Sequence, residues 1–563
     1  MARENGVRSL TEQGRGVRLG AEPPVRTRRR ASPLGVFVVG AVFVMIALPI
    51  AAVLLRAVQP DGVWGTEAVT RILGSPRTWR LIAVTVAQAL ASCTLTIAVG
   101  VPVAWVFSRF RFPARSFFRA LATVPFVLPS VVIGAAFASL LGPQGLVDAR
   151  GTWWAILVAQ LCFNLAVVVR TVGAALSGLD PSQEAAARML GDSPFQAARR
   201  VVLPAVLPAI SAAAVVVFLF CFTSFGVIVM LGGGSVTTVE VEIWTRATRQ
   251  FDISGAAVLC AIQLVAVLAT LSIHARISRK RSTSFSVTLQ RTDRMPRTLW
   301  EWSAVGAAVT VVIIVCGLPI AALFERSLEV NGGIGFEHWQ RLGSAAEGTG
   351  LSIDPLSAML NSLLIATAAS VAAVFLGVAS ARVIAHRPGG SADRILLLPV
   401  GVSATTLGLG FLLLAGRPPF DLRGSLWLVP VAQALVAIPL VVRSVLPALQ
   451  SLPPSLDEAG QLLGVTAQGR FWRIELPAIR PAVIAGAGLA FVACLGEFGA
   501  TVFLVRAARP TAPVAIERLL SRPGGAGFGQ AMALSCILVL FCATVLLLVD
   551  WFAAGDQGLD LSF

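Results

Sequence analysis

Two matching segments, one in each half of the chain, carry the residues with the clearest potential for specific chemistry. Each has a carboxylate, a glycine seven residues later and a proline thirteen residues after the glycine. The members are Glu184, Gly191 and Leu203-Pro204 in the first copy, and Asp457, Gly464 and Leu476-Pro477 in the second. The two glycines and the two prolines are separated by the same interval, which we call the repeat interval. We infer that one ancestral unit of about 270 residues was duplicated and fused, since chance would not keep one spacing over such a length.

The first segment predicts a short surface helix that is suited to binding a partner protein. Asp180 or Ser182 can cap its start, and Glu184 lies in the first turn, where the helix dipole favours a negative charge. Small residues on one side let a partner approach closely: Ala186 and Ala187 in the first copy and Ala459, after Glu458, in the second. The two glycines should each end the helix in a left-handed conformation. Leu203-Pro204 is then expected to turn the chain into the apolar stretch that follows.

The composition of the chain is that of a membrane protein. Hydrophobic residues make up 56 % of it and charged residues 13 %, and the mean hydropathy is +0.81. A membrane span needs about 20 mostly apolar residues, and a helix is the structure that pairs its backbone groups within one segment. We predict twelve spans, six in each half, at residues 33–55, 81–107, 117–141, 153–178, 205–231, 254–274, 301–324, 358–385, 394–415, 425–447, 481–505 and 530–551.

Arginine-rich segments determine the predicted topology. The first 32 residues contain eight arginines and three glutamates, so the positive-inside rule places the N-terminus in the cytoplasm. The segments between predicted spans 2 and 3, 6 and 7, and 8 and 9 are also basic, which places them on the same side. An even number of spans returns the C-terminus to the cytoplasm. Most of the net charge of +16 is therefore explained by topology, and we do not expect nucleic-acid binding.

The predicted fold class is an all-α integral membrane protein with two parallel six-helix repeats. Its parts are a basic cytoplasmic tail at 1–32, a first unit at 33–274, a basic cytoplasmic linker at 275–300, a second unit at 301–552 and a C-terminal tail at 553–563. The eight cysteines all lie inside predicted spans, and the three histidines are scattered at loop edges. We therefore expect neither a disulfide framework nor a metal centre.

Polar residues inside the predicted spans are candidates for a solute path, because ionisable groups are costly in a bilayer. Glu497 is the clearest of them, and its counterpart in the first unit is Ser224. A passing cation would be attracted to this carboxylate. Alternatively, Glu497 bonds a polar neighbour such as Gln433 and only holds helices together. For Asn164, interhelical hydrogen bonding is at least as good an explanation as a place in the path. Phe225 and Phe498 could gate the path or stack on the solute, but core packing is the role that we favour for them.

The duplicated segment, with its E-A-A start, its glycine and its Leu-Pro end, resembles the cytoplasmic loop of permease subunits of ATP-binding-cassette (ABC) importers. In that family the loop contains a coupling helix, which docks in a groove of the ATPase subunit. The resemblance implies that residues 184–204 and 457–477 bind two copies of such a subunit. One departure concerns the glutamate, which in the family lies six residues before the glycine. Here Ala185 holds that place and Glu184 precedes it.

Nucleotide binding is predicted to reside on a separate subunit. A phosphate-binding loop needs Gly-Lys followed by Ser or Thr, and the single lysine of this chain, Lys280, follows Arg279. We therefore expect a transport subunit and not an enzyme, with no cofactor of its own, while the ATPase binds ATP and magnesium. The resemblance also implies a type I importer fold in a lipid bilayer and a substrate-binding protein on the outer face.

The identity of the solute is constrained by resemblance alone. Single chains with two six-span units are characteristic of the thiamine and ferric-iron importers. The Ser-Phe, Leu-Gly-Gly-Gly and Thr-Thr-x-Glu elements within residues 219–244 are most similar to the thiamine permeases. The resemblance implies a small cationic solute, thiamine first and ferric iron as the alternative. A secondary transporter of the facilitator type is more remote, because segment 108–115 lacks the Asp and glycines which that class carries there.

Overall fold

The computed structural model describes residues 33–60, 63–142, 145–280, 293–344, 353–386, 402–416, 422, 425–506, 508–521 and 527–554. Within these residues, ten helical stretches are long and apolar enough to cross a membrane. They are α1 (Pro33–Val58), α3 (Pro76–Arg109), α6 (Trp153–Ser177), α9 (Leu203–Phe222), α12 (Ile253–Lys280), α13 (Leu299–Val312) joined to α14 (Leu318–Leu328), α16 (Pro355–His386), α19 (Leu428–Ser451), α22 (Leu476–Leu495) and α25 (Phe528–Ala554). A π-helical turn, Ile313–Gly317, joins α13 to α14.

The predicted span at 117–141 is a bent pair of helices. α4 (Arg115–Val127) and α5 (Ser130–Leu141) meet at an angle of 109°. Pro129 disfavours helical backbone at the residue before it, and Leu128 is accordingly extended, with φ −70° and ψ 147°. The equivalent predicted span in the second unit, 394–415, is represented by α18 (Ala404–Ala415), and its first half lies outside the described residues.

Two further predicted spans are interrupted in matching places. The span predicted at 205–231 ends as α9 at Phe222 and resumes as α10 (Gly226–Leu231). The span predicted at 481–505 ends as α22 at Leu495 and resumes as α23 (Thr501–Leu504). Hydropathy did not reveal these breaks, because the residues on both sides of each break are apolar. The interruptions position the residues that meet between the two units.

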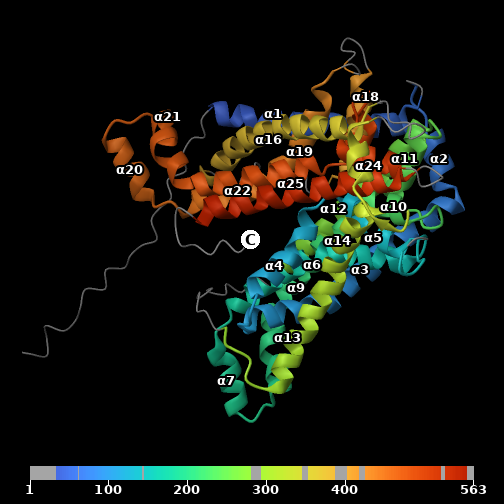
Figure 1. Ribbon diagram of the computed structural model, residues 1–563. Helices are drawn as coiled ribbons and strands as arrows, with labels where there is room; N and C mark the ends of the chain where they lie inside the picture. The colour runs from blue at the N-terminus through green and yellow to red at the C-terminus, as the bar shows by residue number, and fades with distance from the viewer. Residues whose placement is uncertain are drawn as a thin grey trace, which may run out of the picture.

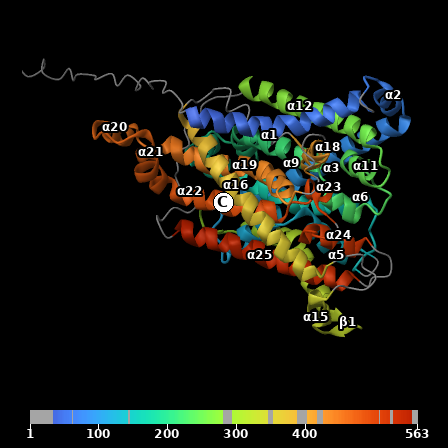
Figure 2. The same cartoon turned by 90° about the horizontal axis from the view of Figure 1, so that it is seen from above.

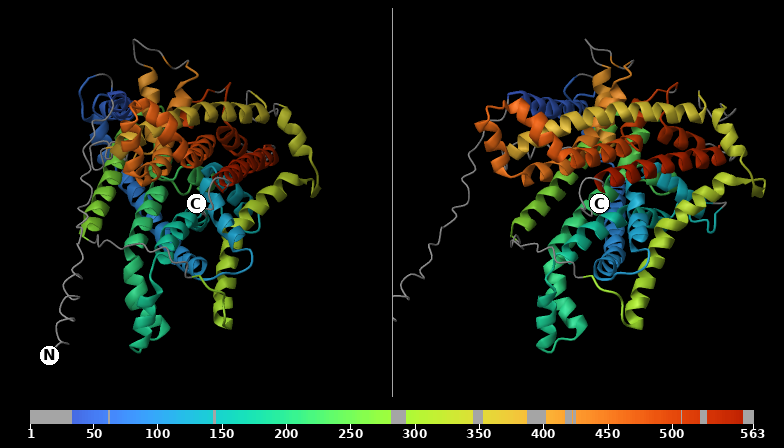
Figure 3. Two further views of the ribbon diagram at one scale, coloured as in Figure 1. Left: turned by 90° about the vertical axis from the view of Figure 1, so that its left-hand side faces the viewer. Right: turned by 60° about the vertical axis from the view of Figure 1, so that its left-hand side comes forward.

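The two units pack in the same way and exchange their first helices. α3, α6 and α9 pack together in the first unit, as α16, α19 and α22 do in the second, and these two sets diverge from a common junction (Figures 1 and 3). α1 lies along α16 and α18 of the second unit, and α14 packs on α5 of the first. α12 lies beside α1 (Figure 2). The predicted all-α architecture with two six-helix repeats is confirmed.

Short elements complete the described structure. α11 (Val239–Thr248) and α24 (Ala512–Leu520) follow the interrupted spans of their units, and Thr238 and Thr511, which precede them, are separated by the repeat interval. α2 (Glu67–Leu73) precedes α3. A two-stranded antiparallel hairpin pairs β1 (Glu329–Val330) with β2 (Gly333–Ile334), in the register Glu329↔Ile334 and Val330↔Gly333. α15 (Glu337–Gln340) and a 3₁₀ turn (Arg341–Gly343) follow the hairpin.

The repeated Phe-Gly pairs explain why the two breaks match. A Cβ on Gly226 would lie 3.0 Å from the backbone nitrogen of Val131, and one on Gly499 would lie 3.1 Å from Cβ of Ala404. Each glycine therefore allows its chain to pass closely over the start of α5 or α18. The neighbouring Phe225 and Phe498 stack on each other, with ring centroids 5.1 Å apart and planes 18° apart. The two equivalent helix breaks are thus in contact through these stacked phenylalanine rings, at the junction of the units.

Candidate functional site

The first repeated segment forms a capped helix that ends at a glycine. α7 (Pro181–Met189) starts at Asp180, whose carboxylate accepts a hydrogen bond from the amide of Ser182 over 2.8 Å. Gly191 has φ +97°, in the left-handed region. Its amide donates to the carbonyl of Arg188, and the next amide, of Asp192, donates to that of Ala187. This pair of bonds is the Schellman motif, which satisfies the last carbonyls of a helix.

The second segment repeats this geometry. α20 (Pro454–Leu462) contains Asp457, Glu458 and Ala459, and the side chain of Asp457 lies outside what the structure describes. Gly464 has φ +71°. Its amide donates to Gln461, and the amide of Val465 donates to Gly460, both over 2.9 Å. The left-handed conformation predicted for both glycines is confirmed.

The predicted turn at Leu203-Pro204 is wrong, because the helix continues through it. After Ser193 caps α8 (Pro194–Ala197), a π-helical turn (Ala198–Val202) leads directly into α9. The second unit matches, with α21 (Ala467–Arg470) and a π-helical turn (Phe471–Glu475) leading into α22. A proline inside a helix lacks its N–H and clashes with the carbonyl four residues earlier. The wider π turn places Pro204 and Pro477 at a new helix start, where both problems disappear.

Each segment exposes a pair of large apolar side chains immediately before its glycine. Met189 and Leu190 are 89 % and 90 % exposed, and their equivalents Leu462 and Leu463 are 89 % and 81 % exposed. Phe195 and Trp472 are also exposed within the same two segments. α7 and α20 lie at the far ends of the two diverging helix sets (Figure 1). Gathered apolar surface of this kind, on polar helices, is typical of a protein-binding site.

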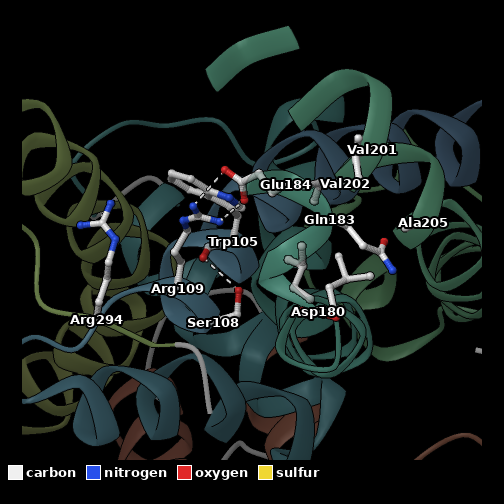
Figure 4. A pocket seen from close by; sticks show the side chains of 12 residues that line it. Trp105, Ser108, Arg109, Asp180, Gln183, Glu184, Val201, Val202, Ala205 and Arg294 are labelled. Carbon is white, nitrogen blue, oxygen red and sulfur yellow. Dashed lines mark hydrogen bonds and ion pairs between the residues drawn. The ribbon is translucent and has the colours of Figure 1, made fainter. Parts of the chain in front are cut away.

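Glu184 faces its own unit. The guanidinium of Arg109, the last residue of α3, donates two hydrogen bonds to its carboxylate, over 2.6 and 3.0 Å (Figure 4). A cavity of about 190 Å³ lies beside this ion pair, and Trp105 and Arg294 also line it. The geometry makes Glu184 an anchor between the loop and α3, with its carboxylate already occupied. Bidentate pairs of this kind fix orientation as well as contributing energy.

An equivalent anchor in the second unit uses a different carboxylate. Arg382 follows Arg109 by the repeat interval, and it donates to Glu475, in the π turn, over 2.8 and 3.2 Å. Neither arginine was expected from the sequence to contact a repeated segment. Their identical register with the repeated segments was the signal that was missed.

The end of the linker attaches to the first unit beside this anchor. The amide of Arg111 donates to the carbonyl of Arg294, and Asp293 pairs with Arg111 and Arg115 over 2.8 and 2.6 Å. The hydrogen bond from Arg111, followed by that from Arg115, holds the pKa of Asp293 well below its usual range. Because this pKa is lowered in the folded state, the contact stabilises the fold fully above the ordinary carboxyl pKa of about 4. This stabilisation is lost only as the pH falls below that value. The linker end therefore stays attached at neutral pH.

The candidate path residues divide into two places. Phe225, Phe498, Ser224 and Glu497 lie at the two breaks where the units meet. Asn164 lies in α6, where its amide donates to the carbonyl of Gln160 over 2.9 Å and contacts the Cys221 sulfur of α9. The structure therefore brings together four of the five, and places Asn164 within the helix packing of the first unit.

The carboxylate of Glu497 is occupied by nearby donors. The amides of Ala500 and Thr501 each donate to it over 3.0 Å, and the hydroxyl of Thr501 donates over 2.7 Å. Gln433 in turn donates to that hydroxyl over 3.1 Å. Glu497 thus satisfies the first amides of α23, as a helix cap does.

A second buried carboxylate joins the units. Glu240, in α11, accepts hydrogen bonds from Gln263 of α12 and from Thr405 of α18, and α18 belongs to the second unit. Its side chain is fully buried. Glu240 belongs to the Thr-Thr-x-Glu element, in a segment that we expected to be a loop, so a buried contact between the units was not expected of it.

Comparisons with known proteins follow the same division into two units. The family model for the binding-protein-dependent transport system inner membrane component matches residues 96–283 and again 373–555. The chain is similar to the thiamine transport system permease protein ThiP of Brucella abortus (26 % identity, covering 85 % of this chain and 88 % of the relative). It is also similar to the ferric transport system permease protein FbpB of Actinobacillus pleuropneumoniae (22 %, 93 % and 80 %). The sulfate transport system permease protein CysT of Salmonella typhimurium is 31 % identical, over a match that covers 41 % of this chain and 86 % of the length of CysT.

Proposed function

This chain belongs to the family of binding-protein-dependent transport system inner membrane components, and we propose that it provides both membrane halves of one ABC importer. It is a multi-pass transport subunit and not an enzyme. Two copies of a cytoplasmic ATPase dock at the repeated segments, bind ATP and magnesium, and supply the energy. A substrate-binding protein delivers the solute at the opposite face, and both termini lie on the ATPase side.

One observation carries this proposal. Each exposed apolar pair, Met189-Leu190 and Leu462-Leu463, is followed by a glycine turn and then by a helix that continues without interruption to the break beside Phe225 or Phe498. A movement of either docked ATPase is therefore transmitted by a rigid helix to the stacked rings between the units. Arg109 and Arg382 tie the same loops to α3 and α16, so the whole unit moves with its ATPase.

Replacing Gly191 and Gly464 together tests the role of the loop geometry. Aspartate at both positions should reduce solute uptake severalfold and uncouple ATP hydrolysis from transport, because a left-handed residue with a Cβ costs about 1 kcal/mol. No atom lies within 4 Å of the place of either Cβ, so the cost is conformational and not steric. Asparagine, which adopts the left-handed region more readily, is the matched control and should retain more activity. Wild-type uptake in the double aspartate variant would remove these glycines from the mechanism.

We infer that the solute is thiamine. The relative with thiamine in its name covers 85 % of this chain, and the ferric relative, which supports the alternative, covers 93 % at lower identity. Uptake of labelled thiamine and of labelled ferric iron, in cells lacking the gene and in cells with it restored, separates the two. The proposal expects thiamine uptake to disappear and return with the gene. Unchanged thiamine uptake with impaired iron uptake would make ferric iron the solute.

A further inference from the structure

A cavity lies between the two units, away from the ATPase-docking segments. It has a volume of about 740 Å³, which is within the range of sites for small organic ligands. Its wall is built from α10 and α11 of the first unit and from α24 and the start of α25 of the second. α11 and α24 lie close together at the end of the molecule remote from α7 and α20 (Figure 1). The cavity is therefore placed to receive a solute from the face opposite the ATPases.

Two residues in equivalent positions of the repeat line this cavity from opposite units. Trp244 in α11 and Glu517 in α24 are separated by the repeat interval, in the same register as the two docking segments. Both side chains are largely buried, with 8 % and 6 % exposed. The duplication thus presents an aromatic ring from one unit and a carboxylate from the other. Phe225, whose ring stacks on Phe498, also forms a T-shaped contact with Trp244, with ring centroids 5.8 Å apart.

Glu517 differs from the other acidic groups at the junction. Within the described residues its carboxylate forms no hydrogen bond and no ion pair, and the charges acting on it are those of Arg249 and Arg518. Glu242 lines the same cavity but pairs with Arg246 over 2.9 Å. Glu497 and Glu240 already accept hydrogen bonds from neighbouring donors. Among the buried carboxylates of the described junction, Glu517 is therefore the one whose acceptor sites are all left for a ligand.

A cationic side chain of the protein, that of Arg249, already lies beside Trp244 in this cavity. The guanidinium of Arg249 lies over the ring of Trp244, 4.6 Å from the ring centroid, and its charge also acts on Glu517. Arg77 and Arg150 also line the cavity, and both are exposed to solvent. These two repel cations, so the attraction for a positive charge is confined to the wall formed by Trp244 and Glu517.

We propose that Trp244 and Glu517 bind the positively charged aromatic ring of an organic cation, and that Arg249 holds this place until the solute displaces it. The inference rests on the proposed importer function and specifies the chemical class of its solute. An indole face attracts a cation most strongly where water is excluded, and a carboxylate on the same cavity adds charge attraction. A ferric ion would require several oxygen ligands, whereas this wall offers one carboxylate and one indole.

Kinetics of thiamine uptake test the assignment in proteoliposomes that contain this chain, its ATPase and its binding protein. Glu517→Gln and Trp244→Leu should each raise the KM for thiamine about tenfold, while ATP hydrolysis stimulated by the binding protein persists. Arg249→Gln should lower the KM, because the competing guanidinium is removed. A gain in affinity cannot result from misfolding. Glu337→Gln, which removes a carboxylate from exposed α15, is the matched control and should change nothing.

The outcomes separate this inference from the function on which it rests. Unchanged KM in the Glu517 and Trp244 variants, with normal uptake, would overturn the cation site and leave the importer intact. A higher KM in the Arg249 variant would also overturn it, because the arginine would then support binding and not compete. If the wild-type complex hydrolyses ATP in response to the binding protein but moves no thiamine, the solute proposal fails.

Discussion

Replacement of Met189, Leu190, Leu462 and Leu463 with serine is expected to detach the ATPase from the membrane subunit. Each of these side chains is at least 81 % exposed in the free chain, so its loss leaves the fold intact. Fully burying one such side chain contributes about 1.5–3 kcal/mol. Removing two from each segment should therefore weaken binding of each ATPase copy by about a hundredfold or more. The affinity of the detergent-solubilised chain for the ATPase, measured by biolayer interferometry, gives this number.

Ile334→Ser is the matched control for this experiment. Ile334 is 90 % exposed, but it belongs to the β-hairpin and not to either docking segment. Its replacement should leave ATPase binding unchanged. If the fourfold serine variant bound the ATPase as tightly as the wild type, residues 184–204 and 457–477 would not be the docking surface.

Replacement of Glu497 with alanine is expected to destabilise the junction of the units. Three donors from Ala500 and Thr501 lose their acceptor within a buried environment. A buried donor left without a partner costs about 1–3 kcal/mol, so the expected loss for three donors is about 3–9 kcal/mol of folding free energy. Thermal unfolding of the purified chain in detergent should show this as a lower Tm.

The first unit supplies a control for the Glu497 experiment. Ser224 occupies the equivalent position, and no hydrogen bond of its hydroxyl occurs within the described residues. Ser224→Ala should therefore leave the Tm unchanged. A Glu497→Ala variant with the wild-type Tm and impaired thiamine uptake would contradict the structural role, and would assign the carboxylate to the solute path.

Sequence reasoning predicted features that depend on local spacing and average hydropathy. The left-handed conformation of Gly191 and Gly464 could be predicted because helix-forming residues precede each glycine and residues that cap the next helix follow it. The membrane helices follow from their apolar length. Both kinds of feature are determined by residues that are close together in the chain, so a single sequence contains the necessary information.

Features that depend on contacts between the units were not predictable in the same way. The breaks after Phe222 and Leu495 lie within apolar sequence, and their cause is the close passage of Gly226 and Gly499 over α5 and α18. Trp244 and Glu517 occupy equivalent positions of the two units, but their side chains differ so much that the sequence does not reveal the equivalence. Only the fold places both on one cavity.

The Leu203-Pro204 pair shows a different limit of sequence reasoning. Proline predicts a helix end, yet here a π turn before the proline joins α8 and α9 into one continuous helix. The consequence is functional, because the part of each docking segment that follows its glycine is continuous with the span. A continuous helix makes the two move together.

The stoichiometry of the purified complex tests the central claim most directly. The chain is expressed with its ATPase, purified by a tag on the chain alone, and weighed by native mass spectrometry. The account predicts one copy of this chain with two copies of the ATPase, because each of its two repeated segments docks one. A complex containing one ATPase per chain, or two chains with two ATPases, would contradict it.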